Sequence, residues 1–391
     1  MASAIVLGAG MVGSVMAADM AAQGFDTAIA DVRRENLDAA SARAGGRVRA
    51  ILADLSDASN VRRVVEPFDV VLGALSSRIG FRALRAVIDA GKPYADISFM
   101  GEDFTELDAL AKDRGVTVVT DCGVAPGMSH ILAAYGASML SPCEAIEIYV
   151  GGLPRVRTWP YEYKAAFSPA DVIEEYTRPA RLVEHGAVVV RPALSEPELM
   201  DFEGVGTLEA FNTDGLRSLC RSLSVPFMKE KTLRYPGHIE LMRVMRETGL
   251  FDETPVEVRG VRVVPRELTS ALLFPKWTYG PGEEDLTVMR VTARGMRGRE
   301  RVTLRWDLLD FYHRPTRATS MARSTAFPCT IVASLIASGR FASPGVNPPE
   351  RLAAFPDLVR ELLAHLETRG MRYVFSESAA AEAAGAVTWG T

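Results

Sequence analysis

The sequence lacks the features that mark membrane-spanning and nucleic-acid-binding proteins. No stretch of about 18 consecutive apolar residues, the length that a membrane-spanning helix needs, occurs among its 391 residues. The formal net charge is −5, which leaves no overall basic surface for nucleic acid or for an anionic membrane. We therefore expect neither a nucleic-acid partner nor a membrane partner.

Cysteine and histidine are scarce, with four and five residues respectively. The cysteines (Cys122, Cys143, Cys220 and Cys329) form no C-x-x-C pair and have no histidine at metal-ligand spacing. Reduced thiols and no metal site are the expectation. The chain opens on a strand-like segment, without the basic and apolar regions of a signal peptide, which predicts a cytoplasmic location.

The first 120 residues alternate between strand-like and helix-like segments. The predicted strands are residues 4–7, 27–30, 48–52, 70–72, 94–97 and 116–120. The predicted helices are residues 12–23, 35–44, 58–66, 80–90 and 103–113. Alternation at this length is typical of parallel strands joined by right-handed crossovers, so it predicts a doubly wound Rossmann domain.

After residue 121 the pattern changes, and strand-like segments outnumber helices up to about residue 315. The clearest is a hairpin in residues 285–307, with its turn at 295–298. Helical patterns return at residues 320–338 and 358–368. We predict an α/β protein of three parts. These are a Rossmann domain in residues 1–125, an α+β substrate-binding and dimerisation domain in 126–318, and C-terminal helices in 319–391 that pack back on the Rossmann domain.

A glycine-rich turn joins the first predicted strand to the first predicted helix. Gly8-Ala9-Gly10-Met11-Val12-Gly13 fits the pattern G-x-G-x-x-G. In such a turn the first glycine allows a tight bend, the second lets a pyrophosphate approach, and the third lets helix and strand pack closely. The free N–H groups at the start of the helix then face the phosphates. The turn therefore predicts a dinucleotide site.

Asp31 ends the second predicted strand, roughly 20 residues on, where a carboxylate hydrogen-bonds the adenosine ribose. Its charge would repel a 2′-phosphate, so NAD is expected and NADP is less favoured. Arg33 and Arg34 follow, and they either offset this repulsion or are solvated residues at a helix start. Further cofactor contacts are expected from residues that follow the next strands, namely Asp54, Leu75, Ser76 and Ser77.

Longer segments carry a family resemblance. They are residues 121–130, 151–154, 208–219, 228–238 and 319–325. In this order and over nearly the whole chain they resemble saccharopine dehydrogenase-like enzymes. Residues 94–103 look like the lysine 6-dehydrogenase branch, although Pro126-Gly127-x-x-His130 is shared with the saccharopine branch.

The resemblance implies oxidative deamination of the ε-amino group of L-lysine. Hydride would pass to the nicotinamide, and hydrolysis of the imine would release ammonia and allysine, which cyclises to Δ1-piperideine-6-carboxylate. Hydride transfer needs a neutral amine, so either a base must accept a proton or the site must select the neutral form. Histidines and carboxylates are the candidates: His130 as a base or water-orienting group, His238, and Asp121 beside Cys122 at the mouth of the cleft. No covalent intermediate is needed, which argues against Cys122 as a nucleophile.

The α-carboxylate of an amino acid needs a cationic partner, and bidentate arginine is the usual one. Arg234, with its neighbour Tyr235, is the predicted clamp; a structural salt bridge is the alternative. Asn212, Thr213 and Asp214 suit an α-amino group or the nicotinamide amide, and a helix N-cap is their alternative role. His238 lines the same pocket or is a structural histidine.

Two rival functions remain open. A saccharopine reductase, or a dehydrogenase of another ω-amino acid or polyamine, would use the same fold. A saccharopine enzyme would need additional cations, for which Arg155, Arg157 and Lys164 are available. The other rival is an NAD-binding protein without turnover. Strand-rich second domains of this family commonly form dimers, so the resemblance implies a homodimer or a higher homo-oligomer.

Overall fold

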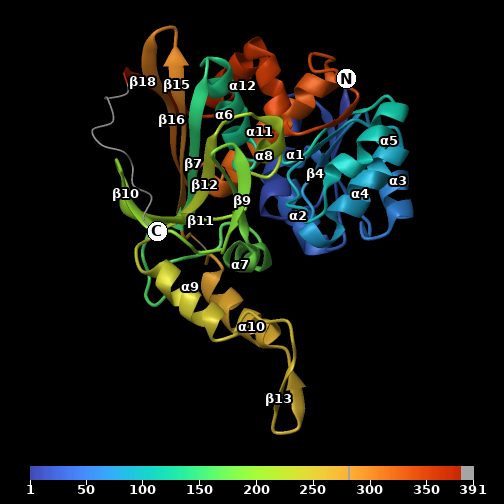
Figure 1. Cartoon of the computed structure of the whole chain (residues 1–391). Helices are drawn as coiled ribbons and strands as arrows, with labels where there is room; N and C mark the ends of the chain where they lie inside the picture. The colour runs from blue at the N-terminus through green and yellow to red at the C-terminus, as the bar shows by residue number, and fades with distance from the viewer. Residues whose placement is uncertain (281, 380–391) are drawn as a thin grey trace.

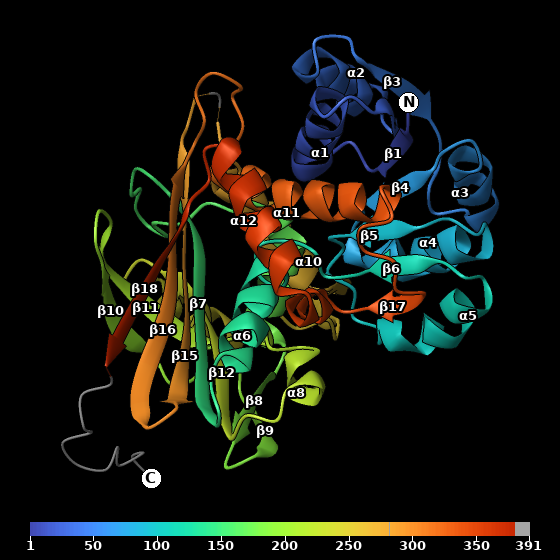
Figure 2. The ribbon, with the colours of Figure 1, turned by 90° about the horizontal axis from the view of Figure 1, so that it is seen from above.

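The computed structural model describes residues 1–280 and 282–379. Two β-sheets stand beside each other, and Figure 2 shows helices of the C-terminal part lying between them. Among the described residues no helix combines the length and the apolar character needed to cross a bilayer.

The first sheet confirms the predicted Rossmann domain. Its strands are β1 (Ser3–Leu7), β2 (Asp26–Asp31), β3 (Val48–Leu52), β4 (Val70–Gly73), β5 (Tyr94–Asp96), β6 (Thr117–Val119) and β17 (Gly345–Asn347). All pairings are parallel, in the order β17-β6-β5-β4-β1-β2-β3. The six strands predicted in the first 120 residues are present, with ends that differ by no more than one residue.

The crossover helices of this sheet also match the prediction. They are α1 (Met11–Ala22), α2 (Arg34–Arg43), α3 (Ala58–Val65), α4 (Ser77–Asp89), η1 (Phe104–Leu107) and α5 (Asp108–Asp113). One face of the sheet packs on α3, α4 and α5, and the other face packs on α1 and the C-terminal helix α11 (Ser320–Ala337). The order of the strands reverses between β1 and β4, and doubly wound sheets bind their ligands at such a reversal.

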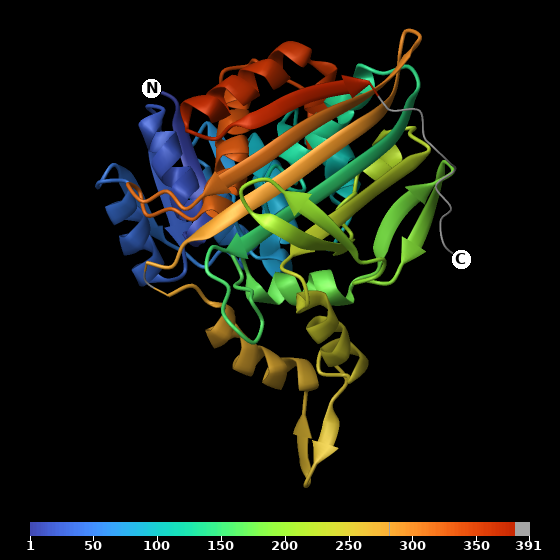
Figure 3. The same cartoon turned by 90° about the vertical axis from the view of Figure 1, so that its left-hand side faces the viewer.

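The second sheet has nine strands and confirms the predicted mixed second domain. They are β7 (Cys143–Pro154), β8 (Ala180–Glu184), β9 (Ala187–Arg191), β10 (Glu198–Phe202), β11 (Gly206–Asn212), β12 (Phe227–Arg234), β15 (Asp285–Arg297), β16 (Glu300–Phe311) and β18 (Tyr373–Ala379). The main path runs β10-β11-β12-β7-β15-β16-β18. Figure 3 shows this sheet face on, with helices behind it. The predicted hairpin is β15–β16; its turn lies between Arg297 and Glu300, at the end of the predicted range.

The helices of the second domain are α6 (Met128–Ser138), α7 (Pro169–Thr177), α8 (Leu219–Ser222), α9 (His238–Glu247) and α10 (Pro265–Trp277). Figure 1 shows α9, α10 and the two-stranded hairpin of β13 (Val256–Val258) and β14 (Val261–Val263) projecting from the rest of the molecule. The helix α7 lies beside the cleft between the two domains and carries several of the side chains discussed below.

The C-terminal segment returns to the Rossmann domain through α11, as predicted. α11 packs against α1, β4 and β5, and Thr330 donates a hydrogen bond of 2.6 Å to Asp19 of α1. The prediction of helices alone was incomplete, because Gly345–Asn347 forms β17 in the first sheet and Tyr373–Ala379 forms β18 in the second. Residues 380–391 lie outside the described part of the chain.

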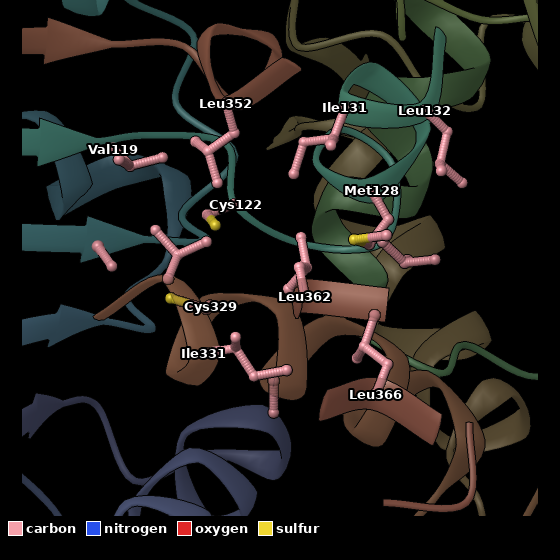
Figure 4. Close-up of a cluster of buried hydrophobic side chains, with 14 of the residues drawn as sticks. Val119, Cys122, Met128, Ile131, Leu132, Cys329, Ile331, Leu352, Leu362 and Leu366 are labelled. Atoms are coloured by element: carbon pink, nitrogen blue, oxygen red, sulfur yellow. The ribbon is translucent and has the colours of Figure 1, made fainter. Parts of the chain in front are cut away.

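The last long helix, α12 (Pro356–Thr368), was predicted to pack on the Rossmann domain, and Arg369 at its C-terminal end forms an ion pair with Asp19 of α1. It packs on α6, α11 and the short helix η2 (Pro349–Ala354). Figure 4 shows the side chains that meet there, including Cys122, Ile131, Cys329 and Leu362. Because this apolar cluster contains residues from both domains, the two domains share one core.

Candidate active site

A cleft of about 610 Å³ lies between the two domains. The Rossmann domain contributes the glycine turn and the ends of β2, β3, β4 and β5. The second domain contributes α7, β7 and β12, and α11 closes part of the wall. The predicted cofactor residues that line the cleft are Gly8, Gly10, Met11, Val12, Gly13, Asp31, Arg33, Asp54, Leu75 and Ser76.

Each of the three positions in the turn favours glycine for a different structural reason. Gly8 has a φ of +101°, and a Cβ there would stand 2.4 Å from the carbonyl oxygen of Ala74. A Cβ on Gly13 would stand 1.9 Å from the carbonyl oxygen of Gly8. A Cβ on Gly10, in contrast, would meet no atom within 4 Å. The open space at Gly10, beside the first residue of α1, is where a pyrophosphate fits.

Asp31 is held by backbone amides. One carboxylate oxygen accepts a hydrogen bond of 2.8 Å from the N–H of Ala9 in the glycine turn, and the other accepts one of 2.8 Å from the N–H of Arg33. With its amide oxygen turned toward Arg33, Asn36 accepts hydrogen bonds of 2.9 and 3.1 Å from that guanidinium. The carboxylate therefore stands at the wall of the cleft, beside the glycine turn.

Asp54 and Ser77 mark two other points of the cleft. Asp54 accepts hydrogen bonds from the backbone and side chain of Ser56, and these lower its pKa. Ser77 does not line the cleft as predicted; its hydroxyl instead donates a hydrogen bond of 2.9 Å across it to Asp171 of α7. We call the part of the cleft around the glycine turn, Asp31 and Asp54 the dinucleotide end.

The prediction that Asp121 and Cys122 lie at the mouth of the cleft is wrong. Both are fully buried behind it. Asp121 has a φ of +52°, which directs its carboxylate to Arg217 at 2.6 Å. That guanidinium also donates to the carbonyl of Met100. Asp121 thus fixes a loop, and its charge is neutralised by an ion pair.

His130 does not reach the cleft either. Its ring lies in the first turn of α6, 3.0 Å from the hydroxyl of Ser129 and 3.1 Å from the carbonyl oxygen of Leu216. Burial, with the nearby charge of Arg217, lowers its pKa to about 3. A neutral histidine with both ring nitrogens engaged holds α6 to the segment after β11, and the role of catalytic base does not fit this position.

Three more predicted residues are buried in the second domain, away from the cleft. His238 sits between the hydroxyl of Tyr176 and the carbonyl oxygen of Tyr161, each at 2.9 Å, and burial lowers its pKa to about 3. Tyr235 donates to the carbonyl of Pro154, and Asn212 donates to the side chains of Ser195 and Glu196. None of the three lines the cleft.

Arg234 lines the cleft as predicted, but its guanidinium is already engaged. It donates to Glu175 at 2.8 Å, to the hydroxyl of Tyr176 at 3.3 Å and to the carbonyl of Leu233 at 3.0 Å. It also stacks over the ring of Tyr163. This arrangement matches the alternative of a structural salt bridge, placed so that it forms one wall of the cleft.

The end of the cleft away from the glycine turn is acidic. A second cavity of about 40 Å³ adjoins it and shares Phe99, Glu175 and Thr232 with its wall. We call this region the inner end; its polar residues are Asp171, Glu174, Glu175, Arg178, Thr213, Asp214, Glu230, Thr232 and Arg234. Of the residues predicted to bind substrate, Thr213, Asp214 and Arg234 are brought together here.

Several residues of the inner end were not predicted, and one pattern pointed to them. Glu230, Thr232 and Arg234 alternate along β12, so all three project from the same face of the strand. All three are buried, which is unusual for a strand of this polarity. Lys229 and Lys231 project from the other face and pair with Glu198. The sequence shows the alternation, but it does not show which face of the strand lines the cleft.

The fold and the cleft define a two-domain dinucleotide-binding protein of the Rossmann class. Two family models match the chain: the saccharopine dehydrogenase NADP binding domain over residues 4–119 and the saccharopine dehydrogenase C-terminal domain over residues 123–371. The chain therefore belongs to the saccharopine dehydrogenase family. The N-terminal match indicates a nicotinamide dinucleotide as the cofactor, which fits the open space at Gly10.

Individual relatives are distant. The chain is 25% identical over 250 residues to alpha-aminoadipic semialdehyde synthase of Arabidopsis thaliana, with 58% of this chain and 23% of that protein covered. It is 23% identical over 263 residues to carboxynorspermidine synthase of Vibrio cholerae, with 63% of this chain and 61% of that protein covered. The chain thus spans less than two thirds of either relative.

Among solved structures, the L-glutamate-forming saccharopine dehydrogenase of Saccharomyces cerevisiae matches with a TM-score of 0.79. The match covers 97% of this chain and 100% of that one at 17% identity. At this identity the likeness establishes a shared fold.

Proposed function

We propose that this chain is a dehydrogenase that oxidises the ε-amino group of L-lysine, releasing ammonia and allysine. The observation that carries the proposal is the acidic inner end of the cleft. Its carboxylates belong to Asp171, Glu174, Glu175, Asp214 and Glu230, and its guanidiniums to Arg178 and Arg234. Asp214 pairs with Arg181, Glu174 with Arg266 and Arg178, and Glu175 with Arg234. Asp171 and Glu230 have no ion pair among the described residues, and their negative charge favours a substrate with more ammonium groups than carboxylates. Lysine, with two ammonium groups and one carboxylate, meets this condition.

Saccharopine carries three carboxylates, and the cations that it would need are elsewhere. Arg155, Arg157 and Lys164 pair with Glu284, Glu162 and Glu283 respectively, and none of the three lines the cleft. The acidic inner end also suits a carboxylated polyamine. That substrate class is the second candidate, and the relationship to carboxynorspermidine synthase supports it.

Arg178 is the proposed partner of the substrate carboxylate, in place of Arg234. Among the described residues its ion pair is a single contact of 3.6 Å with Glu174, whereas Arg234 is held by Glu175 and Tyr176. Arg178 also stacks on Phe99, which fixes its orientation at the wall of the smaller cavity. Its guanidinium therefore retains free donors for a carboxylate.

NAD is the proposed cofactor. The matching family model is named for NADP, but the carboxylate of Asp31 lies beside the glycine turn, and its charge would repel a 2′-phosphate. The glycine turn would hold the pyrophosphate and Asp31 the ribose. When bound, the nicotinamide supplies the hydride acceptor, while the chain orients the amine and manages its protons.

A spectrophotometric screen tests the proposal. Purified protein is given NAD or NADP with L-lysine, saccharopine, ornithine, diaminopimelate or carboxynorspermidine at alkaline pH, and reduction of the cofactor is followed. We expect reduction of NAD with L-lysine. Reduction with saccharopine alone, or with none of these substrates, would overturn the assignment.

The variant Arg178→Gln tests the carboxylate contact. It should raise the KM for the amino acid roughly 10- to 100-fold, the range of one charged hydrogen-bonded contact. The affinity for NAD should stay unchanged. Arg155→Gln, which removes a guanidinium outside the cleft, is the matched control and should leave both constants as they are. An equal loss of affinity for amino acid and NAD would refute the role of Arg178.

A further inference from the structure

Three buried polar side chains form a continuous line from the cleft into the second domain. Thr232 of β12 lies in the wall shared by the cleft and the smaller cavity. Its hydroxyl is 2.9 Å from that of Thr213, which is 2.6 Å from a carboxylate oxygen of Glu230. Their exposed fractions are 5%, 4% and 3%. The line is therefore shielded from bulk solvent, and one end of it lies at the cleft.

The chemistry of the acceptor sets the direction of these hydrogen bonds. An ionised carboxylate only accepts, so the single proton of Thr213 must be donated to Glu230. Thr213 then has only lone pairs for Thr232, so Thr232 must donate its own proton to Thr213. This leaves the lone pairs of Thr232 directed at the cleft. With Glu230 ionised, Thr232 presents an acceptor to a bound ligand, which suits an N–H donor.

Glu230 differs from the other acidic groups that face it. Asp214 pairs with Arg181, Glu174 with Arg266 and Arg178, and Glu175 with Arg234. For Glu230 no ion pair is found within the described residues 1–280 and 282–379. A Cβ on Gly215 would stand 2.2 Å from its carboxyl group, so the backbone closes over this side chain. Thr213 is thus the polar partner through which Glu230 communicates with the cleft.

We propose that Thr232, Thr213 and Glu230 form a proton relay that deprotonates the substrate ammonium before hydride transfer. This inference rests on the proposed amine oxidation. In the step, an N–H bond of the ammonium breaks and its proton passes to Thr232. Thr232 gives its own proton to Thr213, which gives its proton to Glu230. The nitrogen keeps the electron pair, and the carboxylate becomes a carboxylic acid.

The electrostatic surroundings of Glu230 fit this task. The pKa of Glu230 is raised to about 8, chiefly by burial and also by the charges of Glu175 and Asp214, while the hydrogen bond from Thr213 lowers it. The other charged groups at the inner end are Glu174, Arg178 and Arg234, which are paired with one another or with Arg266 and Glu175, and Asp171, which accepts a hydrogen bond from Ser77. A proton acceptor is most effective when its pKa lies near the working pH. The smaller cavity, at about 40 Å³, is large enough for a water molecule that returns the proton to solvent.

Glu230→Gln is the first test, measured as kcat, KM and the pH profile of NAD reduction by L-lysine. We expect kcat near pH 8 to fall roughly 100-fold, the lower range of general base catalysis. KM and NAD affinity should stay within about twofold. Above a pH of about 10.4, where lysine amines become neutral, the difference from wild type should shrink. A purely structural role would give the same loss at every pH.

Two substitutions at Thr213 separate the relay from folding. Thr213→Val has nearly the same shape without the hydroxyl and should reproduce the pH-dependent loss, whereas Thr213→Ser should retain most of the activity. Glu198→Gln, a glutamate that pairs on the opposite face of β12, is the matched control and should behave as wild type.

The outcomes are distinguishable. If wild type reduces neither NAD nor NADP with any amine, the proposed function fails and the relay with it. If wild type is active and Glu230→Gln keeps the wild-type kcat and pH profile, the relay alone is overturned. A loss in Thr213→Val that is independent of pH, or that Thr213→Ser shares in full, also overturns it.

Discussion

The dinucleotide end and the inner end of the cleft are built from different parts of the polypeptide. The dinucleotide end depends on backbone: three glycines, amide groups at the start of α1, and a carboxylate fixed by two N–H groups. The inner end depends on buried side chains that hold one another, such as Arg234 with Glu175 and Tyr176. A backbone site follows from local geometry, whereas a side-chain network requires elements far apart in the sequence to meet.

At the dinucleotide end, the variants Gly13→Ala and Gly10→Ala should have the largest effects, the first on stability and the second on NAD affinity. The Cβ of Gly13→Ala would overlap the carbonyl of Gly8, and overpacking against backbone should cost more than about 3 kcal/mol of unfolding free energy. Gly10→Ala meets no atom, so its thermal unfolding should equal wild type while NAD affinity falls at least about tenfold. Differential scanning calorimetry and NAD titration check both. Normal folding of Gly13→Ala would contradict the packing argument.

Acidification should destabilise the second domain, which contains two buried histidines outside the cleft. The pKa of His130 and that of His238 are lowered from 6.5 to about 3 in the folded protein, chiefly by burial. The unfolded chain therefore binds more protons below pH 6.5, and folding stability must fall as the pH decreases from 6.5 toward 3. We expect the free energy of unfolding to fall by up to about 1.4 kcal/mol per pH unit for each histidine. Denaturant titrations at pH 7 and pH 5 measure this.

The variant His238→Gln assigns part of that acid sensitivity. It should be less stable than wild type at pH 7, because it loses the hydrogen bond between His238 and the hydroxyl of Tyr176. Its stability should, however, depend less on pH. His365→Gln, which alters an exposed histidine of α12, should keep the wild-type dependence. An unchanged pH dependence in His238→Gln would show that His238 is not a buried neutral histidine.

Asp31→Asn should produce a smaller change, confined to the cofactor. Asparagine keeps an acceptor for the N–H of Ala9 but lacks the charge. We expect NAD to bind about tenfold more weakly and NADP to gain relative to NAD. Fluorescence titration with both dinucleotides gives the ratio. Asp26→Asn, at the opposite end of β2, is the control; an unaltered ratio in Asp31→Asn would remove the argument for NAD.

The smallest effect should come from Ser77→Ala, because Ser77 connects the two domains across the cleft. Loss of its hydrogen bond to Asp171 should change NAD affinity by about fivefold or less, near 1 kcal/mol. Stopped-flow binding should show faster association, since one hydrogen bond that holds the two domains together is gone. Slower association would indicate that this contact orders the cofactor site instead.

The sequence predicted the first sheet well, and all the residues predicted to contact the cofactor except Ser77 line the cleft, because both predictions depend on local patterns. Strand periodicity, helix length and the glycine spacing are readable within a few residues of each other. β17 was missed because Gly345, Val346 and Asn347 are too few to carry a periodicity. It forms where α5 and β6 provide partners for its backbone.

The inner end was predicted poorly, for a physical reason. In the sequence, His130 and Asp121 are close to residues 123–126, which line the cleft. However, the position of His130 in the first turn of α6 directs its ring to Leu216, and the positive φ of Asp121 directs its carboxylate to Arg217. Glu175 lies in α7 and Arg178 directly follows it, and no local signal distinguishes a helix beside a cleft from any other amphipathic helix. The orientation of a side chain in a loop or helix depends on its tertiary partners.

The position of β17 has a consequence for synthesis of the protein. Thr117, in the strand that β17 borders, and Ser343, just before β17, are hydrogen-bonded although they are 226 residues apart in the chain. As the chain leaves the ribosome, the edge of β6 stays unpaired until the segment more than 200 residues later has emerged. Exposed strand edges attract other chains and chaperones. The nascent chain thus carries an open strand edge while the second domain is synthesised, and the first sheet is completed only afterwards.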